Sequence, residues 1–297
     1  MSLTSKLPDT QASKPLHKVP IDKVGVEDVY RRICLKSFRG KICLDTSISV
    51  SIDLPKEQRG IHVSRDIEAI LDVFNVIEYS DFSVLEEAVE SLSRELLKRH
   101  NYASKAEASI KTIFIYEYRD STLSLEEHVP VKLSIKSKVI DKQNNVVYRT
   151  VCIEVIGMTV CPCAQQVCSH TLNIDPVHAP SHTQRAKLSI CVKSRSDPID
   201  IEALIVASLE SFSTPVFSHL KRDNECKLIL KGFKNAKFAE DVVRDALYNL
   251  YKRLNNAVGL DEVFVMVKSY ESIHPFNMVI KARYKLSELG KYLMGEG

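Results

Sequence analysis

Apolar and polar residues follow two different periods along this chain, and the two alternate in a regular order. A period of two predicts strands, whereas apolar positions three and four residues apart predict helices. The predicted strands are 43–54, 110–118, 131–140, 146–156, 186–193, 263–268 and 278–284. The predicted helices are 66–78, 83–99, 201–212 and 238–256. Strands, helices and antiparallel strands therefore occur in the same order twice, which predicts an α+β protein.

This order divides the chain into three predicted segments. Residues 1–20 are polar, contain Pro and Ser, and are expected to form a flexible N-terminal arm. Residues 21–157 form a first half and residues 158–297 a second half. The two halves are not visibly alike in sequence, so the duplication rests on the order of the elements. Long strands leave sheet edges that need covering, which favours oligomerisation.

Local signals support some of the element boundaries. Ser83 and Glu86 have the spacing of a capping box at the start of a helix. Residues 141–145 are expected to form a hairpin turn between two strands. Thr214-Pro215 is expected to interrupt the helix that begins at 201.

Composition narrows the class of protein. The 297 residues include 41 basic and 38 acidic side chains, which leaves a net charge of +3. A nucleic-acid-binding protein would have a strongly basic face, so no nucleic-acid partner is expected. No apolar run approaches the ~20 residues needed to span a bilayer. The N-terminus also lacks the apolar core of a signal peptide, so we expect a cytoplasmic protein without a membrane partner.

The eight cysteines do not resemble a secreted disulfide framework, because most are scattered or lie in apolar strands. Cys34, Cys43, Cys152 and Cys191 are interpreted as small buried hydrophobic side chains.

A cluster of cysteine and histidine in 158–185 is the strongest chemical signal. It contains three cysteines and three histidines directly after an apolar strand. Thiolate and imidazole are the ligands that zinc and ferrous iron prefer, so the cluster indicates a metal-dependent enzyme. Cys161 and Cys163 flank a proline that bends the chain, so we expect one thiol to face the site and the other to pack. His182 lies at the start of a strand and is the second candidate ligand.

Two other interpretations of the cluster remain open. In the first interpretation, the thiols of Cys161 and Cys163 are buried groups beside a turn. In the second, Cys161, Cys163, Cys168 and His170 form a closed structural zinc site, although a paired second half is missing. His170 and His178 are otherwise expected to be structural or exposed.

Further candidates lie outside the cluster. Glu271 and His274 are three residues apart in a loop between two strands, where they could act as base and orienting group or converge on one ion. Glu240 opens a long helix, where a negative charge stabilises the helix dipole. Glu225 falls in a charged stretch that is interpreted as a solvated loop. Residues 60–65 could supply a helix N-terminus, a His and an Arg, which suit an anion.

Taken in order, these segments resemble the GTP cyclohydrolase IB family, and within it the archaeal MptA-type members. The resemblance covers most of the chain. Its motifs are 9–11, 21–26, 54–55 with 60–65, 160–163, 182–185, 221–225, 237–244 and 271–275. Ala236 stands where the family usually has Pro, and Val63 where Met is common; both are minor departures.

The resemblance implies a tunnelling fold with two tandem ββααββ units in one chain. Subunits of that fold associate through their sheets into barrels, as homodimers or homotetramers, with active sites at subunit interfaces. It also implies hydrolysis of the guanine ring of GTP at C8 with release of formate. In the archaeal type the products are 7,8-dihydroneopterin 2′,3′-cyclic phosphate and pyrophosphate, for methanopterin-type cofactors. The metal is Fe²⁺, one per subunit, and bacterial relatives accept Zn²⁺ or Mn²⁺.

The resemblance also assigns roles to residues of this chain. Cys161 is the essential cysteine, and Glu271 lies beside the metal as a ligand or proton carrier. Glu240 anchors the guanine edge, while Arg65 and Arg185 are candidates to hold the triphosphate. The implied metal ligands are Cys161, His182, Glu225 and His274.

Three alternatives remain at this stage. A bacterial-type enzyme would retain the phosphates and make 7,8-dihydroneopterin triphosphate for folate-type cofactors. Another tunnelling-fold enzyme would act on a purine or pterin with the Glu240 anchor but without the full metal set. A zinc-stabilised binding module would need a closed metal site and would unfold on chelation.

Overall fold

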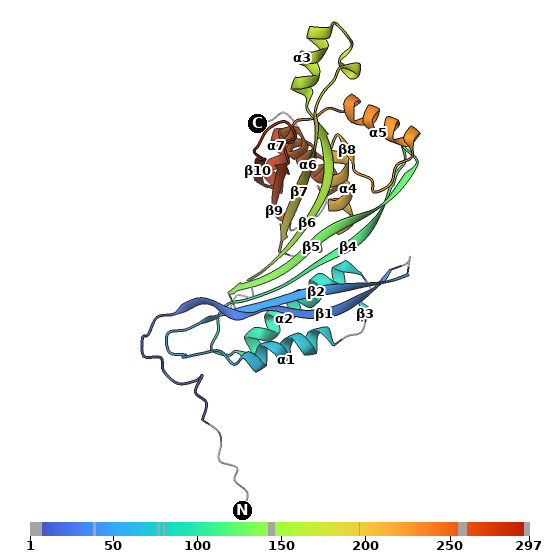
Figure 1. Cartoon of the computed structure of the whole chain (residues 1–297). Coiled ribbons are helices and arrows are strands. Elements are labelled where there is room, and N and C mark those ends of the chain that lie inside the picture. The colour runs from blue at the N-terminus through green and yellow to red at the C-terminus, as the bar shows by residue number, and fades with distance from the viewer. Residues whose placement is uncertain are drawn as a thin grey trace, which may run out of the picture. The chain divides into compact units, whose positions relative to one another are not determined.

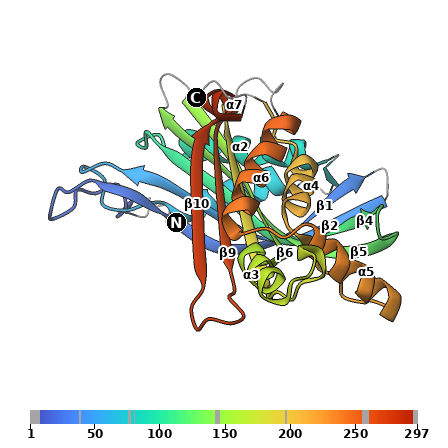
Figure 2. The ribbon, with the colours of Figure 1, turned by 90° about the horizontal axis from the view of Figure 1, so that it is seen from above.

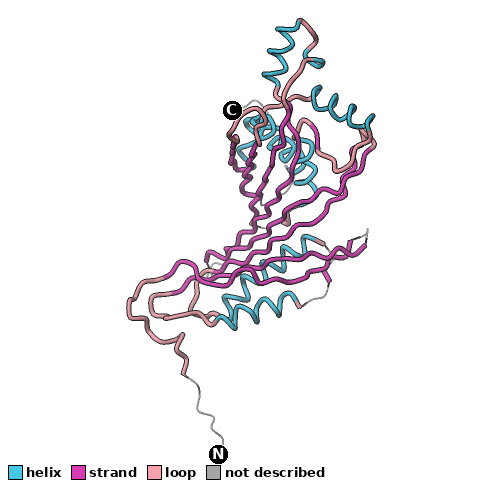
Figure 3. The backbone as a smooth tube through the Cα atoms, in the orientation of Figure 1, coloured by secondary structure: helices cyan, strands magenta, loops and turns pink. Residues whose placement is uncertain are grey.

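The computed structural model describes residues 8–37, 40–75, 78–79, 81–141, 146–195, 197–254 and 260–293. The chain forms two compact units, one made of Met1–Thr112 with Ser134–Thr150 and the other of Ile113–Leu133 with Val151–Gly297. This division differs from the predicted boundary between 157 and 158. The reason is that three long strands, β4 (Ala106–Asp120), β5 (Leu125–Asp141) and β6 (Val146–Val160), each contribute residues to both units (Figure 3).

The first unit is a sheet with two helices on one face (Figure 1). Its other elements are β1 (Ile21–Ser37), β2 (Gly40–Leu54), α1 (Val63–Phe74), β3 (Glu78–Tyr79) and α2 (Phe82–Arg99). β2 pairs antiparallel with β1 and with β4, and β3 pairs parallel with the outer side of β1. The β1–β2 register shifts at two places, between Ile21 and Val24 and between Val26 and Val29.

The core of the first unit follows from the alternation that predicted its strands. Ile48 and Ile110 are opposite each other on β2 and β4, and both are completely buried. Ile70 of α1 and Leu92 of α2 are also 0% exposed. The start of α2 differs from the prediction, because Asp81 and not Ser83 caps the helix and accepts hydrogen bonds from the backbone N–H groups of 83 and 84.

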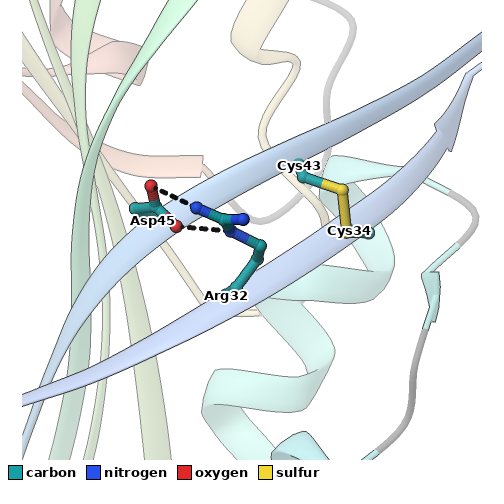
Figure 4. Close-up of a disulfide and its surroundings, with 4 residues drawn as sticks. All are labelled: Arg32, Cys34, Cys43 and Asp45. Carbon is teal, nitrogen blue, oxygen red and sulfur yellow. Dashed lines mark hydrogen bonds and ion pairs between the residues drawn. A yellow bond between two sulfur atoms is a disulfide. The ribbon is translucent and has the colours of Figure 1, made fainter.

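The prediction that Cys34 and Cys43 are separate buried hydrophobic side chains is wrong. They face each other in the β1–β2 register and form a disulfide with Cα atoms 4.0 Å apart (Figure 4). Two residues along the same pair of strands, the guanidinium of Arg32 donates two hydrogen bonds to Asp45, at 2.7 and 3.0 Å. Both side chains of this ion pair are exposed, so it contributes little to stability.

The second unit is an antiparallel sheet with the strand order β10-β9-β7-β6-β5-β4. β7 is Thr183–Ser194, β9 is Leu260–Ser269 and β10 is Met278–Lys285, while the short β8 (Thr214–Pro215) pairs with β6. Its helices are α3 (Pro162–Leu172), α4 (Ile201–Ser211), α5 (Arg222–Lys234), α6 (Ala239–Leu254) and α7 (Leu286–Leu293), with a 3-10 turn η1 at Pro176–His178. Helix α4 packs against α6, and α6 against β9 and β10 (Figure 2).

Apolar strand residues and helix residues form the core of the second unit. Ile190 of β7 and its partner Val265 of β9 are completely buried, as are Leu204 of α4 and Val242 of α6. A second disulfide joins Cys152 of β6 to Cys191 of β7, with Cα atoms 4.1 Å apart. The interpretation of these two cysteines as unpaired hydrophobic residues is therefore also wrong.

Among the described elements longer than three residues, β1, α3, α5 and α7 were not predicted. The short β3, β8 and η1 were not predicted either. The helix α5 replaces the solvated loop expected around Glu225. The turn expected at 141–145 falls largely outside the described residues. The segment before β1 contacts the first unit, because the loop at 58–62 forms hydrogen bonds with residues 9–13. None of the helices that the structure describes has a stretch long and apolar enough to cross a bilayer.

Candidate active site

A cavity of about 300 Å³ in the second unit gathers thiol, imidazole and carboxylate side chains from four separate segments. Its chemical groups come from the start of α3, the start of β7, the start of α6 and the connection between β9 and β10. Figure 2 shows this connection as a loop beyond the ends of the two strands. The lining residues are Cys161, His182, Gln184, Lys237, Phe238, Ala239, Glu240, Glu271, His274, Phe276 and Met278.

Cys161 occupies the N-cap position of α3. Its sulfur accepts a hydrogen bond from the backbone N–H of Ala164, at 3.5 Å. Pro162 at the first helical position fixes the backbone for the helix start. The helix N-terminus favours negative charge on the capping group, which suits a thiolate. The neighbouring Cys163 is exposed and does not line the cavity.

The backbone ties Cys161 to the start of β7. The N–H of Cys161 donates to the carbonyl of His182 at 3.1 Å, and the hydroxyl of Ser181 donates to the carbonyl of Cys161 at 2.6 Å. The His182 ring is half-buried, and its Nδ1 lies 2.9 Å from Oε1 of Gln184. This contact occupies one ring nitrogen, so Nε2 is the nitrogen left to act on a ligand or an ion.

The β9–β10 loop supplies a carboxylate and an exposed imidazole. The hydroxyl of Ser269 donates to Oε1 of Glu271 at 2.7 Å. The rings of His274 and Phe276 are stacked, with centroids 5.1 Å apart and planes 4° from parallel. The prediction that Glu271 and His274 share a loop is confirmed, and both lie on the rim of the cavity.

A set of partly buried hydrogen bonds holds the loop that leads to Glu240. The N–H of Lys237 donates to the carbonyl of Val160, at 3.0 Å, one residue before Cys161. The ammonium of Lys237 donates to Asp245 at 2.7 Å and to the carbonyl of Ser211 at 3.2 Å. Its charge is thereby satisfied within the protein. Glu240 follows in the first turn of α6, as its sequence position predicted.

Three predicted site residues are not gathered at this cavity. Glu225 is exposed on α5, and Arg185 is exposed on β7. Arg65 belongs to the first unit, where its guanidinium donates to the carbonyl of Arg99 at 3.1 Å.

The residues on the cavity fit a divalent metal in kind, since they offer one thiol and two imidazoles beside carboxylates. Across the described part of the chain, no three His, Cys, Asp or Glu side chains lie close enough as placed to hold an ion together. This holds for Cys161, Cys163, Cys168 and His170 of the alternative closed zinc site as it does for the other candidate ligands.

Comparison with known proteins identifies the family of the chain. The family model described as Type I GTP cyclohydrolase folE2 matches residues 7–280. The chain belongs to this family. This confirms the resemblance read from the motifs and makes the protein an enzyme.

Relatives of this cyclohydrolase-family chain cover it almost completely. GTP cyclohydrolase MptA of Aeropyrum pernix is 35% identical over 282 residues, covering 95% of this chain and 97% of that protein. The protein of the same name from Methanothermobacter thermautotrophicus is 30% identical, covering 95% and 96%.

Solved structures share the fold at much lower identity. Uricase from Arthrobacter globiformis superposes with a TM-score of 0.52 at 8% identity, covering 89% of this chain and 93% of that one. A uricase from Bacillus fastidious gives 0.51 at 9% identity, covering 91% and 95%. These likenesses concern the α+β fold with its antiparallel sheet, and not the chemistry.

Gln184 and Lys237 line the cavity of this family member but were not singled out from the sequence. Both stood inside quoted motifs, 182–185 and 237–244. Their polar side chains lie within two or three residues of His182 and Glu240, and this proximity was the signal available.

Proposed function

We propose that this chain is a metal-dependent GTP cyclohydrolase. It opens the guanine ring at C8, releases formate, and forms 7,8-dihydroneopterin 2′,3′-cyclic phosphate and pyrophosphate for methanopterin-type cofactors. The observation that carries the proposal is the single cavity shared by Cys161, His182, Glu240, Glu271 and His274. The names of the relatives, GTP cyclohydrolase MptA, support GTP as the substrate and a cyclohydrolase activity.

The proposed metal is Fe²⁺, one per subunit, with Zn²⁺ or Mn²⁺ as substitutes. Cys161, His182 and His274 would hold it from the cavity, and Glu225 would complete the set from α5. When bound, such an ion lowers the pKa of a coordinated water toward neutrality and so supplies a nucleophile. The site needs an open coordination position for that water.

The protein side chains would bind the substrate and transfer protons. The carboxylate of Glu240 can accept hydrogen bonds from the ring N–H and the exocyclic amine of guanine together, which fixes C8 relative to the thiol and imidazoles. Glu271, oriented by the hydroxyl of Ser269, takes and returns protons at its free oxygen during ring opening. His274 is at the exposed rim. Arg65 and Arg185 are the proposed triphosphate contacts.

We also propose that the chain contains two tandem ββααββ units and assembles through its sheets into barrels, as a homodimer or homotetramer. The order of the longer elements supports this. With the short β3, β8 and η1 and the helices α3, α5 and α7 set aside, β1-β2-α1-α2-β4-β5 is followed by β6-β7-α4-α6-β9-β10. The strand β10 ends the sheet order of the second unit, and its Val279 is 53% exposed. An edge strand offers unpaired backbone N–H and C=O groups with which a strand of a second subunit can pair. We place the protein in the cytoplasm.

Anaerobic turnover of GTP tests the proposal. The chain is loaded with Fe²⁺ under reductant, formate is quantified, and the pterin is identified by mass. Cys161→Ala should abolish formate release, whereas the matched control Cys163→Ala, an exposed thiol on the same helix, should leave it unchanged. Absence of formate from the iron-loaded wild-type chain would overturn the proposal.

Product mass separates the principal alternative. A bacterial-type enzyme would yield 7,8-dihydroneopterin triphosphate without pyrophosphate. The zinc-stabilised binding module is disfavoured, because the chain belongs to an enzyme family whose model matches residues 7–280.

A further inference from the structure

A side-chain contact between Gln184 and His182 lies at the cavity. Oε1 of Gln184 lies 2.9 Å from Nδ1 of His182, and both residues line the cavity with Cys161. The hydroxyl of Ser272 lies on the same side of the ring, 3.4 Å from Nδ1. Among the described residues, no hydrogen-bond partner is found for Nε2 of His182.

The chemistry of the two groups determines where the imidazole proton resides. An amide oxygen only accepts hydrogen bonds, so this contact is a hydrogen bond when Nδ1 carries the ring proton. The neutral ring then has its lone pair on Nε2. Without such an acceptor, a neutral histidine can carry its proton on either nitrogen.

The backbone around the pair is fixed, which makes the contact reproducible. The carbonyl of His182 accepts from the N–H of Cys161 at 3.1 Å, and the carbonyl of Arg185 accepts from the N–H of Tyr270 at 3.0 Å. From Ala186 onward, β7 is paired with β9. Gln184 and His182 therefore sit between two anchored points, two residues apart and on the same side of the chain.

We propose that Gln184 is a positioning residue that holds His182 in the Nδ1–H tautomer and presents Nε2 to the cavity. Its consequence for the enzyme rests on the proposed function, in which His182 binds the metal through Nε2. Partners that orient a metal-binding histidine in this way typically contribute 10–100-fold in metal affinity.

Solid-state ¹⁵N NMR of the full, metal-free chain labelled at histidine tests the tautomer directly. The difference between wild type and His182→Asn assigns the His182 signals. The wild-type ring should show a protonated Nδ1 and a bare Nε2, and Gln184→Met should lose this pattern. The matched control Gln166→Met changes an exposed glutamine of α3 and should keep it. A wild-type Nε2–H tautomer, or an unchanged spectrum in Gln184→Met, overturns the proposal.

Titration with Co²⁺, followed by thiolate charge-transfer absorption, tests the consequence. Gln184→Met should weaken Co²⁺ binding by about 10–100-fold. Gln184→Glu, which keeps an accepting oxygen, should restore most of it. Equal affinities in wild type and Gln184→Met overturn the positioning role. If the wild-type chain binds no Co²⁺, the metal-dependent function fails instead, while the NMR measurement still decides the role of Gln184.

Discussion

Gly157 of β6 lies against the buried ring of Phe212, and this contact gives a sharp test of the packing in the second unit. A Cβ added at 157 would lie 2.2 Å from two ring atoms of Phe212. The ring cannot move away easily, because Phe212 is 2% exposed and its carbonyl accepts hydrogen bonds from Asn235 at 3.1 Å and Lys237 at 3.4 Å. Gly157→Ala should therefore lower the free energy of unfolding by about 1–3 kcal/mol through overpacking.

The sign of the effect should reverse when the ring is removed. In a Phe212→Ala background the added methyl meets no ring, and alanine in a strand interior is favoured over glycine by roughly 0.5–1 kcal/mol. The two substitutions should therefore be coupled by about 1.5–4 kcal/mol in a double-mutant cycle. Urea unfolding followed by circular dichroism measures all four proteins.

Gly60→Ala is the matched control, since a Cβ there meets only a side-chain carbon of Gln11 at 3.7 Å. It should change stability little. Equal destabilisation by Gly157→Ala in both backgrounds would refute the reasoning, because the cost would then not come from the ring.

Three further outcomes are expected. Replacing Cys152 and Cys191 by Ala removes a disulfide with a sequence separation of 39 residues and should cost roughly 4 kcal/mol. Dithiothreitol should lower the thermal midpoint of wild type more than that of the variant, which keeps the Cys34–Cys43 disulfide, and equal shifts in the two proteins contradict this. Burial opposes ionisation of Asp120, but hydrogen bonds from Lys231 and the N–H of Leu123 outweigh it and hold the pKa of Asp120 below its ordinary 3.8. The stability that ionised Asp120 contributes is thus present above pH 3.8 and is lost as the pH falls through its lowered pKa. Asp120→Asn should therefore be less stable than wild type by about 1–3 kcal/mol at neutral pH. This difference in stability should shrink in acid. Lys237→Met leaves Asp245 and the carbonyl of Ser211 without the hydrogen bonds that Lys237 donates, so both the unfolding midpoint and the affinity for GTP should fall. A variant that keeps full affinity for GTP would show that Lys237 does not help to place Glu240.

Elements with a clear apolar period were predictable, and those without one were not. The helix α6 has a stripe of buried residues that includes Val242 and Leu250, and its predicted start was confirmed within one residue. The helix α3 buries only Gln165, so it has no apolar stripe to detect. The strand β1 was missed because its two register shifts break the alternation of period two.

Prediction of the site residues depended on different information from prediction of the helices and strands. Periodicity could place His274 in a loop and Glu240 at a helix start, but only the family motifs connected them with Cys161. The disulfides could not be predicted, because the pairing of Cys34 with Cys43 depends on strand register. A one-residue slip would have turned the two thiols to opposite faces of the sheet.

The sharing of β4, β5 and β6 between both units has a practical consequence for dissecting the protein. The chain passes from one unit to the other three times, after Thr112, Leu133 and Thr150. No single cut can separate the units, and a gene fragment ending at 157 would carry strand segments whose partners are missing. Such fragments should aggregate, so any study of one half in isolation requires a rebuilt connection between strands rather than a simple truncation.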